Sequence, residues 1–100
     1  MKRKLQYRAL ARRDFVQIAE WSQGQWGMAQ TRRYLGEIEA QFQRLIENPM
    51  LGQPAGLPQP GLRKLAAGRH TIFYMASDST VEVVRILHQQ MDHAARLGLR

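Results

Sequence analysis

The chain has 100 residues, no cysteine, and a net charge of +7 at pH 7 from 15 Lys and Arg against 8 Asp and Glu. This length predicts one domain, residues 1–100, with one core. The absence of cysteine from the sequence excludes disulfides and thiolate chemistry. No apolar run approaches the roughly 18 residues that a membrane-spanning helix needs. Because the basic start MKRKLQYRAL is not followed by an apolar stretch, we expect no export signal and a cytoplasmic protein.

Arginine supplies 12 of the 15 basic residues. Its planar guanidinium group suits carboxylates and phosphates, which it binds through several N–H donors at once. The excess of positive charge therefore fits two interpretations. Charge repulsion keeps a soluble domain monodisperse, or the charge attracts an acidic partner such as nucleic acid or an acidic protein segment.

The first half of the chain predicts a short strand followed by two helices. The strand covers residues 6–8. Apolar residues at helical spacing predict a first helix over residues 11–23, with Asp14 in an early turn where its charge meets the helix dipole. Glycines on either side of Trp26 predict a tight connection, and a continuous apolar stripe predicts a second helix over residues 28–48.

The second half predicts a loop rich in proline and glycine over residues 51–61 and then three strands. Residues 62–66, 69–76 and 81–88 are rich in β-branched and aromatic side chains and are separated by short turns. Residues 89–97 predict a short C-terminal helix. The order β-α-α-β-β-β plus this helix favours an α+β fold, a helical hairpin packed on a small curved antiparallel sheet. The hairpin must cover one sheet face, and we expect the other face to be free.

The last two predicted strands carry polar residues where a buried strand should be apolar. Strict alternation places Val83, Arg85 and Leu87 on one face of the last strand and Ile86 and His88 on the other. Hairpin pairing brings several such side chains into one patch of sheet, able to bind RNA or to cleave it by acid–base catalysis. The candidates for this patch are Arg63, Arg69, His70, Tyr74, Arg85 and His88.

Purely structural roles explain the same residues. Arg85 can pair with Asp92 at the junction of strand and tail, with His88 capping it, since a buried unpaired guanidinium costs several kcal/mol. Trp21 and Trp26 can act as wedges at the helical turn, or they can belong to a partner surface, where aromatic residues are frequent anchors. The histidine spacing is poor for zinc, so we expect no metal and no cofactor.

Several segments in order resemble one known family. ARRDF (11–15), WG (26–27), PMLG (49–52), HTIFY (70–74) and above all RILHQQMD (85–92) are similar to the ParE toxins of the RelE/ParE toxin–antitoxin superfamily. The resemblance covers nearly the whole chain and implies the same helical hairpin on a curved sheet. It also implies a protein without enzymatic activity or cofactor that inhibits DNA gyrase.

The resemblance further implies a ParD-like antitoxin as the partner, with an acidic, amphipathic segment that wraps the toxin in a hetero-oligomer. Operator DNA would be contacted only through that antitoxin. The hairpin and the tail are then candidate parts of the partner surface. With the strand residues beside them, its candidate residues are Trp21, Trp26, Arg63, Arg69, Arg85, His88, Met91 and Asp92.

Three alternatives stay open. The first is a RelE-like, ribosome-dependent mRNA endonuclease, whose catalytic set here would be Arg63, Tyr74, Arg85 and His88. Against it, the tail after His88 has no tyrosine and lysine is scarce. The second is another basic binding module, and the third is a degenerate toxin that still binds its antitoxin.

Overall fold

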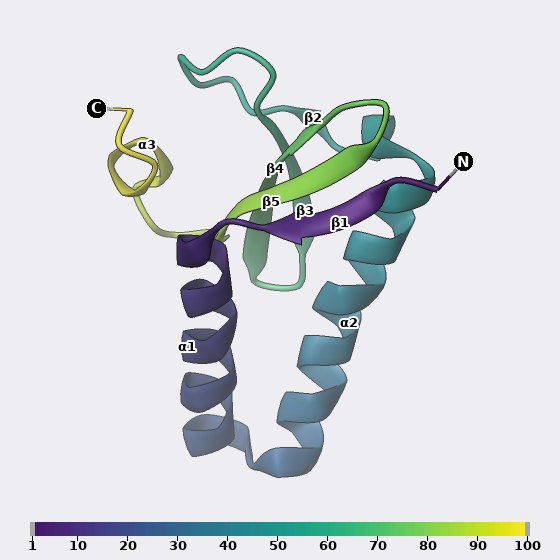
Figure 1. The fold of residues 1–100 in the computed structure, drawn as a ribbon. Helices are drawn as coiled ribbons and strands as arrows, with labels where there is room; N and C mark the ends of the chain where they lie inside the picture. The colour runs from purple at the N-terminus through teal and green to yellow at the C-terminus, as the bar shows by residue number, and fades with distance from the viewer. Residues whose placement is uncertain (1, 100) are drawn as a thin grey trace.

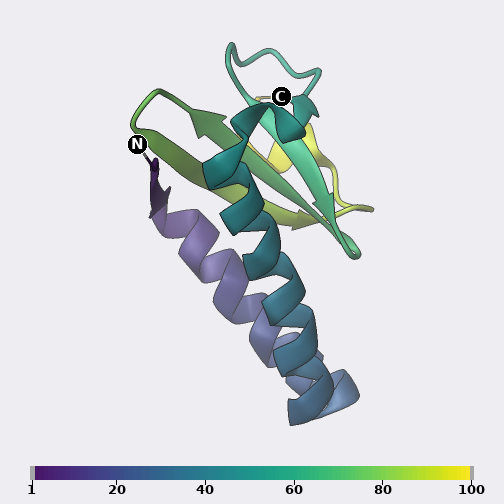
Figure 2. The same cartoon turned by 90° about the vertical axis from the view of Figure 1, so that its right-hand side faces the viewer.

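The computed structural model describes residues 2–99, so Met1 and Arg100 of the predicted domain lie outside the described residues. Helices α1 (Ala9–Trp26) and α2 (Met28–Glu47) form a hairpin against a five-stranded sheet (Figure 1). Both predicted helices are confirmed, although α1 begins earlier and ends later than its apolar spacing indicated. The closed end of the hairpin projects beyond the sheet in both views (Figures 1 and 2).

The sheet contains β1 (Lys4–Tyr7), β2 (Gln53–Pro54), β3 (Arg63–Ala67), β4 (His70–Ala76) and β5 (Thr80–His88), in the order β1-β5-β4-β3-β2. Strands β3, β4 and β5 form the predicted antiparallel meander. β2 lies inside the segment 51–61 that the sequence predicted to be a loop, so that part of the prediction is wrong. β1 runs parallel to β5, so the sheet is mixed rather than wholly antiparallel. A short turn forces antiparallel pairing only on strands that it joins directly, and most of the chain separates β1 from β5.

A β-bulge changes the side-chain alternation in β5. Phe73 pairs with Arg85 and Tyr74 with Val83, so Val84 is an extra residue on this strand. Beyond the bulge, Ile86 joins Val83 in the core beneath the helices, while Leu87 packs on the opposite face. The faces predicted for Ile86 and Leu87 are therefore wrong, because strict alternation does not allow for an inserted residue.

Both sheet faces are covered. The larger core lies between the hairpin and the sheet and includes Ile38, Phe42, Leu45 and Ile72. The expectation of a free second face is wrong, because a smaller core lies there. It comprises Ala55, Leu62, Phe73, Val84 and Leu87, packed against Leu57, Met75, Leu97 and Leu99. The loop before β3 and the C-terminal tail with α3 (His93–Arg96) supply this cover, and α3 lies behind the sheet in Figure 2.

Buried polar bonds fasten the loop between α2 and β2. The Tyr74 hydroxyl donates to the carbonyl oxygen of Pro49 at 2.6 Å and accepts from the Gly52 N–H at 3.0 Å. The Arg63 guanidinium donates to the Gly52 carbonyl oxygen. Gly52 is required at this crossing, since a Cβ atom there would lie 2.4 Å from the Tyr74 hydroxyl oxygen.

Candidate functional site

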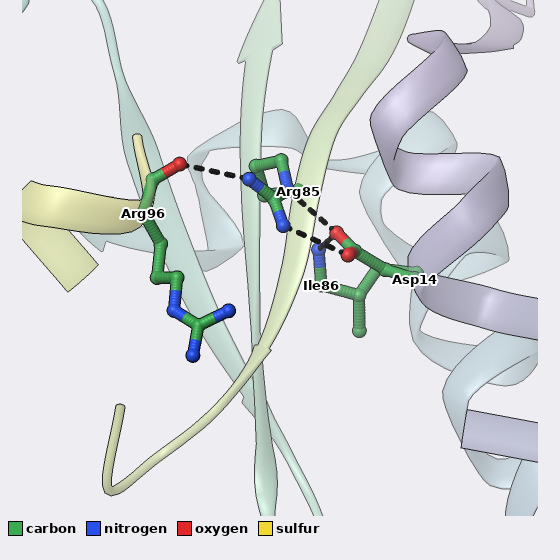
Figure 3. Close-up of polar contacts among 4 residues, drawn as sticks. All are labelled: Asp14, Arg85, Ile86 and Arg96. Carbon is green, nitrogen blue, oxygen red and sulfur yellow. Dashed lines mark hydrogen bonds and ion pairs between the residues drawn. The ribbon is translucent and has the colours of Figure 1, made fainter. Parts of the chain in front are cut away.

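A buried ion pair joins the hairpin to β5. The Arg85 guanidinium donates through Nε and Nη2 to both Asp14 carboxylate oxygens, at 2.7 and 2.9 Å, and through Nη1 to the Arg96 carbonyl oxygen at 2.8 Å (Figure 3). The side chains are only 14% and 8% exposed. The hydrogen bonds from Arg85 to Asp14 raise the pKa of the guanidinium further above its usual value, against the effect of burial.

The Asp14 carboxylate occupies the place of a missing strand. β1 ends at Tyr7, which lies opposite Val83, so the Ile86 N–H farther along β5 has no strand to bond. An Asp14 oxygen accepts from that N–H at 2.9 Å (Figure 3). Asp14 therefore joins α1 to the open edge of β5 instead of meeting the helix dipole. Since α1 begins at Ala9, Asp14 lies beyond the first turn, and that prediction is wrong.

The predicted Arg85–Asp92 pair is also wrong, because all three guanidinium nitrogens of Arg85 bind other groups. The Asp92 side chain caps α3 by accepting from the Ala95 N–H at 3.2 Å. His88 does hold the turn that precedes α3. Its Nδ1 accepts from the Gln90 N–H at 3.2 Å, and its carbonyl oxygen lies 3.0 Å from a ring nitrogen of His93.

A row of rings crosses from the hairpin to the sheet. Trp21 contacts Trp26 edge to face at a centroid distance of 5.4 Å, and Trp26 contacts Tyr34 at 5.7 Å. Tyr34 lies 5.6 Å from His70, which lies 5.4 Å from His88 across the β4–β5 pairing. These contacts connect α1, α2, β4 and β5 through side chains that present both apolar faces and polar edges.

His70 is held neutral within this row. Its Nδ1 lies 2.6 Å from the Tyr34 hydroxyl. Burial, and next the neighbouring His88, lower the pKa of His70 to about 4, while Asp14 opposes the change. Burial also raises the pKa of Tyr34, so its hydroxyl stays protonated.

One cavity of about 370 Å³ opens beside this row, between α1 and the ends of β4 and β5. We call it the hairpin cavity. It brings together six of the eight predicted partner residues, which are Trp21, Trp26, Arg69, Arg85, His88 and Met91. Trp21 and Met91 remain 53% and 38% exposed, so apolar surface is available around the cavity.

The partner surface predicted from the sequence lacked seven residues that line the cavity, namely Asp14, Gln17, Ile18, His70, Ile86, Leu87 and Arg96. The spacing of Asp14, Gln17 and Trp21 places them on neighbouring positions of one helical face, which is a signal that could have identified the α1 wall. His70 lies directly opposite His88 in the β4–β5 register, so correct hairpin pairing would have added it.

The remaining predicted residues lie elsewhere. Arg63 pairs with Tyr74 at the other end of β4 from the His70–His88 pair, and Asp92 is not among the residues that line the cavity. Tyr74 is fully buried, with its hydroxyl bonded to backbone groups. The catalytic set proposed for the endonuclease alternative, Arg63, Tyr74, Arg85 and His88, is therefore not assembled in one site.

Residues 2–99 lack the features of a metal site and of a membrane-spanning helix. In that part of the chain no group of three or more His, Cys, Asp or Glu side chains is placed to hold a metal ion. None of the helices described has the length and apolar character needed to cross a membrane.

Comparison with known proteins decides the family. Residues 5–93 match the family described as ParE toxin of type II toxin-antitoxin system, parDE. The chain belongs to this family. Toxin ParE1 of Mycobacterium tuberculosis is 39% identical over 83 residues, which cover 82% of this chain and 85% of that protein. Toxin ParE1 of Caulobacter vibrioides is 36% identical over 88 residues, which cover 88% and 91%. The predicted ParE-type toxin is thereby confirmed.

Solved structures confirm the RelE/ParE-like fold of this ParE family member. The chromosomal ParDE toxin–antitoxin system from P. aeruginosa matches with a TM-score of 0.74 at 17% identity, covering 87% of this chain and 96% of that chain. The RelBE2 toxin–antitoxin complex from Mycobacterium tuberculosis matches with a TM-score of 0.65 at 22% identity, covering 89% and 100%. At these identities the likeness shows the fold alone.

Proposed function

We propose that this chain is the toxin of a ParDE-type pair, which inhibits DNA gyrase in the cytoplasm by binding it. A ParD-like antitoxin silences it in a hetero-oligomer by placing side chains of an acidic, amphipathic segment in the hairpin cavity. Operator DNA is contacted through the antitoxin. The observation that carries this proposal is the meeting of six predicted partner residues in one cavity.

The surroundings of the cavity suit a protein partner. Tryptophan, arginine and methionine are among the residue types enriched in protein interfaces, and Trp21, Trp26, Arg69 and Met91 supply them here. A charge of +7 speeds encounter with an acidic segment. The family match supports an antitoxin as that segment's source.

Binding, rather than catalysis, agrees with how the reactive side chains are used. The Arg85 and Asp14 charges satisfy each other, and the Tyr74 hydroxyl is buried against the backbone. A general acid or base has to reach the proton that it transfers. The Tyr74 hydroxyl is not exposed to a substrate, which supports a toxin that acts by occupying a surface on its target.

The deciding experiment is a gyrase assay with the purified protein, in which supercoiling and trapped cleaved DNA are measured. We expect cleaved complexes to accumulate with the toxin and to vanish when the antitoxin is added. A Trp26→Ala variant should still trap gyrase if the cavity serves the antitoxin alone, and it should then resist neutralisation. An assay without any gyrase effect at excess toxin would contradict the proposed target, and mRNA cleavage on ribosomes would be tested next.

A further inference from the structure

We propose that the hairpin cavity selects a carboxylate, so that the antitoxin segment filling it carries an Asp or Glu side chain next to a large apolar one. This inference rests on the proposed function and adds the chemistry of the group that is recognised. It follows from which polar atoms of the cavity wall are already used and which remain available.

Among the described residues, Asp14 is the one carboxylate on the cavity wall, and its charge is already paired with that of Arg85. It accepts two hydrogen bonds from Arg85 and one from the Ile86 N–H. The third nitrogen of Arg85 donates to the Arg96 carbonyl oxygen. Neither member of this pair therefore offers an unmatched charge to a ligand, and the polarity of the cavity is set by the remaining side chains.

The hydrogen bonds of Tyr34 assign the tautomer of His70. The Tyr34 oxygen accepts from the Arg69 N–H at 2.9 Å, and its own proton has two possible acceptors. His70 Nδ1 lies 2.6 Å away and the Ala67 carbonyl oxygen 3.4 Å away, so the shorter contact takes the proton. With Nδ1 as an acceptor, neutral His70 carries its proton on Nε2.

His88 is assigned in the same way. Its Nδ1 accepts from the Gln90 N–H, which leaves the proton of the neutral ring on Nε2. Among residues 2–99, the buried side-chain nitrogens and oxygens without a partner are Ser22 Oγ and Arg63 Nε alone. Within the same residues no hydrogen bond is formed by the Nε2 atoms of His70 and His88, and since neither atom is in that group, neither is fully buried.

Two guanidinium groups add to these donors. The ion pairs in the described part of the chain are Arg8–Glu82 and Arg85–Asp14, so neither Arg69 nor Arg96 is neutralised there. Arg69 lies over the Trp26 ring at 5.7 Å. Figure 3 shows the Arg96 guanidinium pointing away from the Arg85–Asp14 pair.

The wall thus carries two imidazole, two guanidinium and two indole side chains, all of which can donate, against the Gln17 amide oxygen and the Asp14 carboxylate that Arg85 already pairs. A carboxylate accepts hydrogen bonds only and matches such a donor excess, and charge assistance makes these bonds strong. Ile18, Trp21 and Met91 belong to the apolar part of the wall, which suits a large apolar neighbour on the same segment.

The test is titration calorimetry with the protein encoded beside this gene. Each Asp and Glu of its C-terminal segment is changed in turn to Asn or Gln. We expect one of these changes to weaken binding about 10- to 100-fold. On the toxin, Arg69→Gln and His88→Phe should each weaken binding to a similar degree. His88→Gln keeps an N–H donor and should bind more tightly than His88→Phe.

Arg44→Gln is the matched control, because Arg44 is an exposed arginine that does not line the cavity. It should change the affinity less than about threefold, as expected for the loss of one remote charge. Circular dichroism melting checks that every variant is folded. One further measurement combines His88→Phe on the toxin with the Asn or Gln substitution on the antitoxin that weakened binding. The combined loss of binding free energy should be smaller than the sum of the two single losses, since both changes remove the same contact.

The cavity would take only an apolar group if Arg69→Gln and His88→Phe bound the antitoxin as tightly as the parent while Trp26→Ala bound it more weakly. That result overturns this inference and leaves the proposed function standing. If the parent toxin binds no adjacent gene product, the proposed function fails and the inference with it. A single-stranded oligonucleotide that binds with the same dependence on Arg69 and His88, and that the protein partner does not displace, would also overturn it.

Discussion

At the scale of single residues, the hairpin cavity is organised by bonds that leave some groups neutralised and others free. Asp14 and Arg85 cancel each other's charge while they join α1, β5 and the backbone of α3. Tyr34 fixes the ring of His70, which also lines the cavity. The same contacts that stabilise the fold therefore decide which donors reach a ligand.

Replacing Asp14 by Asn should lower the free energy of unfolding by about 3 kcal/mol, because a guanidinium that is 14% exposed would lose its countercharge. Urea denaturation measures the change. The control is Glu82→Gln, which breaks the exposed Arg8–Glu82 pair and should cost less than about 1 kcal/mol. Equal losses in the two variants would contradict a special role for the buried pair.

His70 should make the protein less stable in acid. Burial and His88 lower the pKa of His70 from 6.5 to about 4, although nearby Asp14 acts in the opposite direction. Between these values the unfolded chain binds a proton that the folded protein does not, so stability falls as the pH drops from about 6.5 to about 4. His70→Gln, which retains an acceptor for Tyr34, should show a shallower loss in urea titrations over this range. Identical pH dependences would show that other groups cause the acid sensitivity.

At the scale of elements, irregular features of the strands and loops position the residues of the hairpin cavity. The bulge at Val84 turns Ile86 toward the hairpin and Leu87 toward the tail, the reverse of what strict alternation from Val83 would give. β1 stops early enough for α1 to place Asp14 against the open edge of β5. The Tyr74 hydroxyl fastens the loop after α2 at Gly52, where the chain runs beside Lys64 of β3.

Gly52→Ala should destabilise the protein by about 2 kcal/mol or more, since the new Cβ would meet the Tyr74 hydroxyl and the Lys64 carbonyl oxygen at 2.4 and 2.5 Å. Thermal melting measures the effect. Gly36→Ala is the matched control. Gly36 lies inside α2, where an added Cβ would point into open space, so the change should stabilise the helix by about 0.5–1 kcal/mol. A loss of similar size at both positions would refute the crossing as the cause.

At the scale of the whole molecule, charge and shape act together. The hairpin projects beyond the sheet (Figure 1). It carries one wall of the cavity, while the sheet and the tail supply the others. The net charge of +7 gives the molecule as a whole a positive field. Long-range attraction then brings an acidic partner close, and the local donors of the cavity set its final position.

Association with the acidic partner should slow as salt is added. Stopped-flow tryptophan fluorescence can follow the rate, because Trp21 and Trp26 line the cavity. We expect the association rate constant to fall about tenfold between roughly 0.05 and 0.5 M salt, as screening shortens the range of the field. The dissociation rate constant should change much less. An association rate that does not depend on salt would argue against electrostatic steering.

Local patterns predicted much of the fold. The spacing of apolar residues predicted both helices, and the β-branched runs with short turns predicted the meander of β3, β4 and β5. These signals are local, because a helix or a hairpin is specified by neighbours in the chain. The parallel position of β1, the two-residue β2 and the bulge left no comparable pattern.

For the hairpin cavity, too, local sequence patterns predicted some features and tertiary packing decided the others. The sequence by itself determined which residue types are present, the basic charge and the ParE resemblance, and it indicated Trp21, Trp26, Arg85 and His88 as candidates. Only the tertiary structure decided that Arg85 bonds to Asp14, 71 positions away, rather than to nearby Asp92. The physical reason is that an ion pair forms between groups that folding brings together. The packing of α1 against the open edge of β5 brings Asp14 next to Arg85, and the spacing of residues along the chain does not predict this packing.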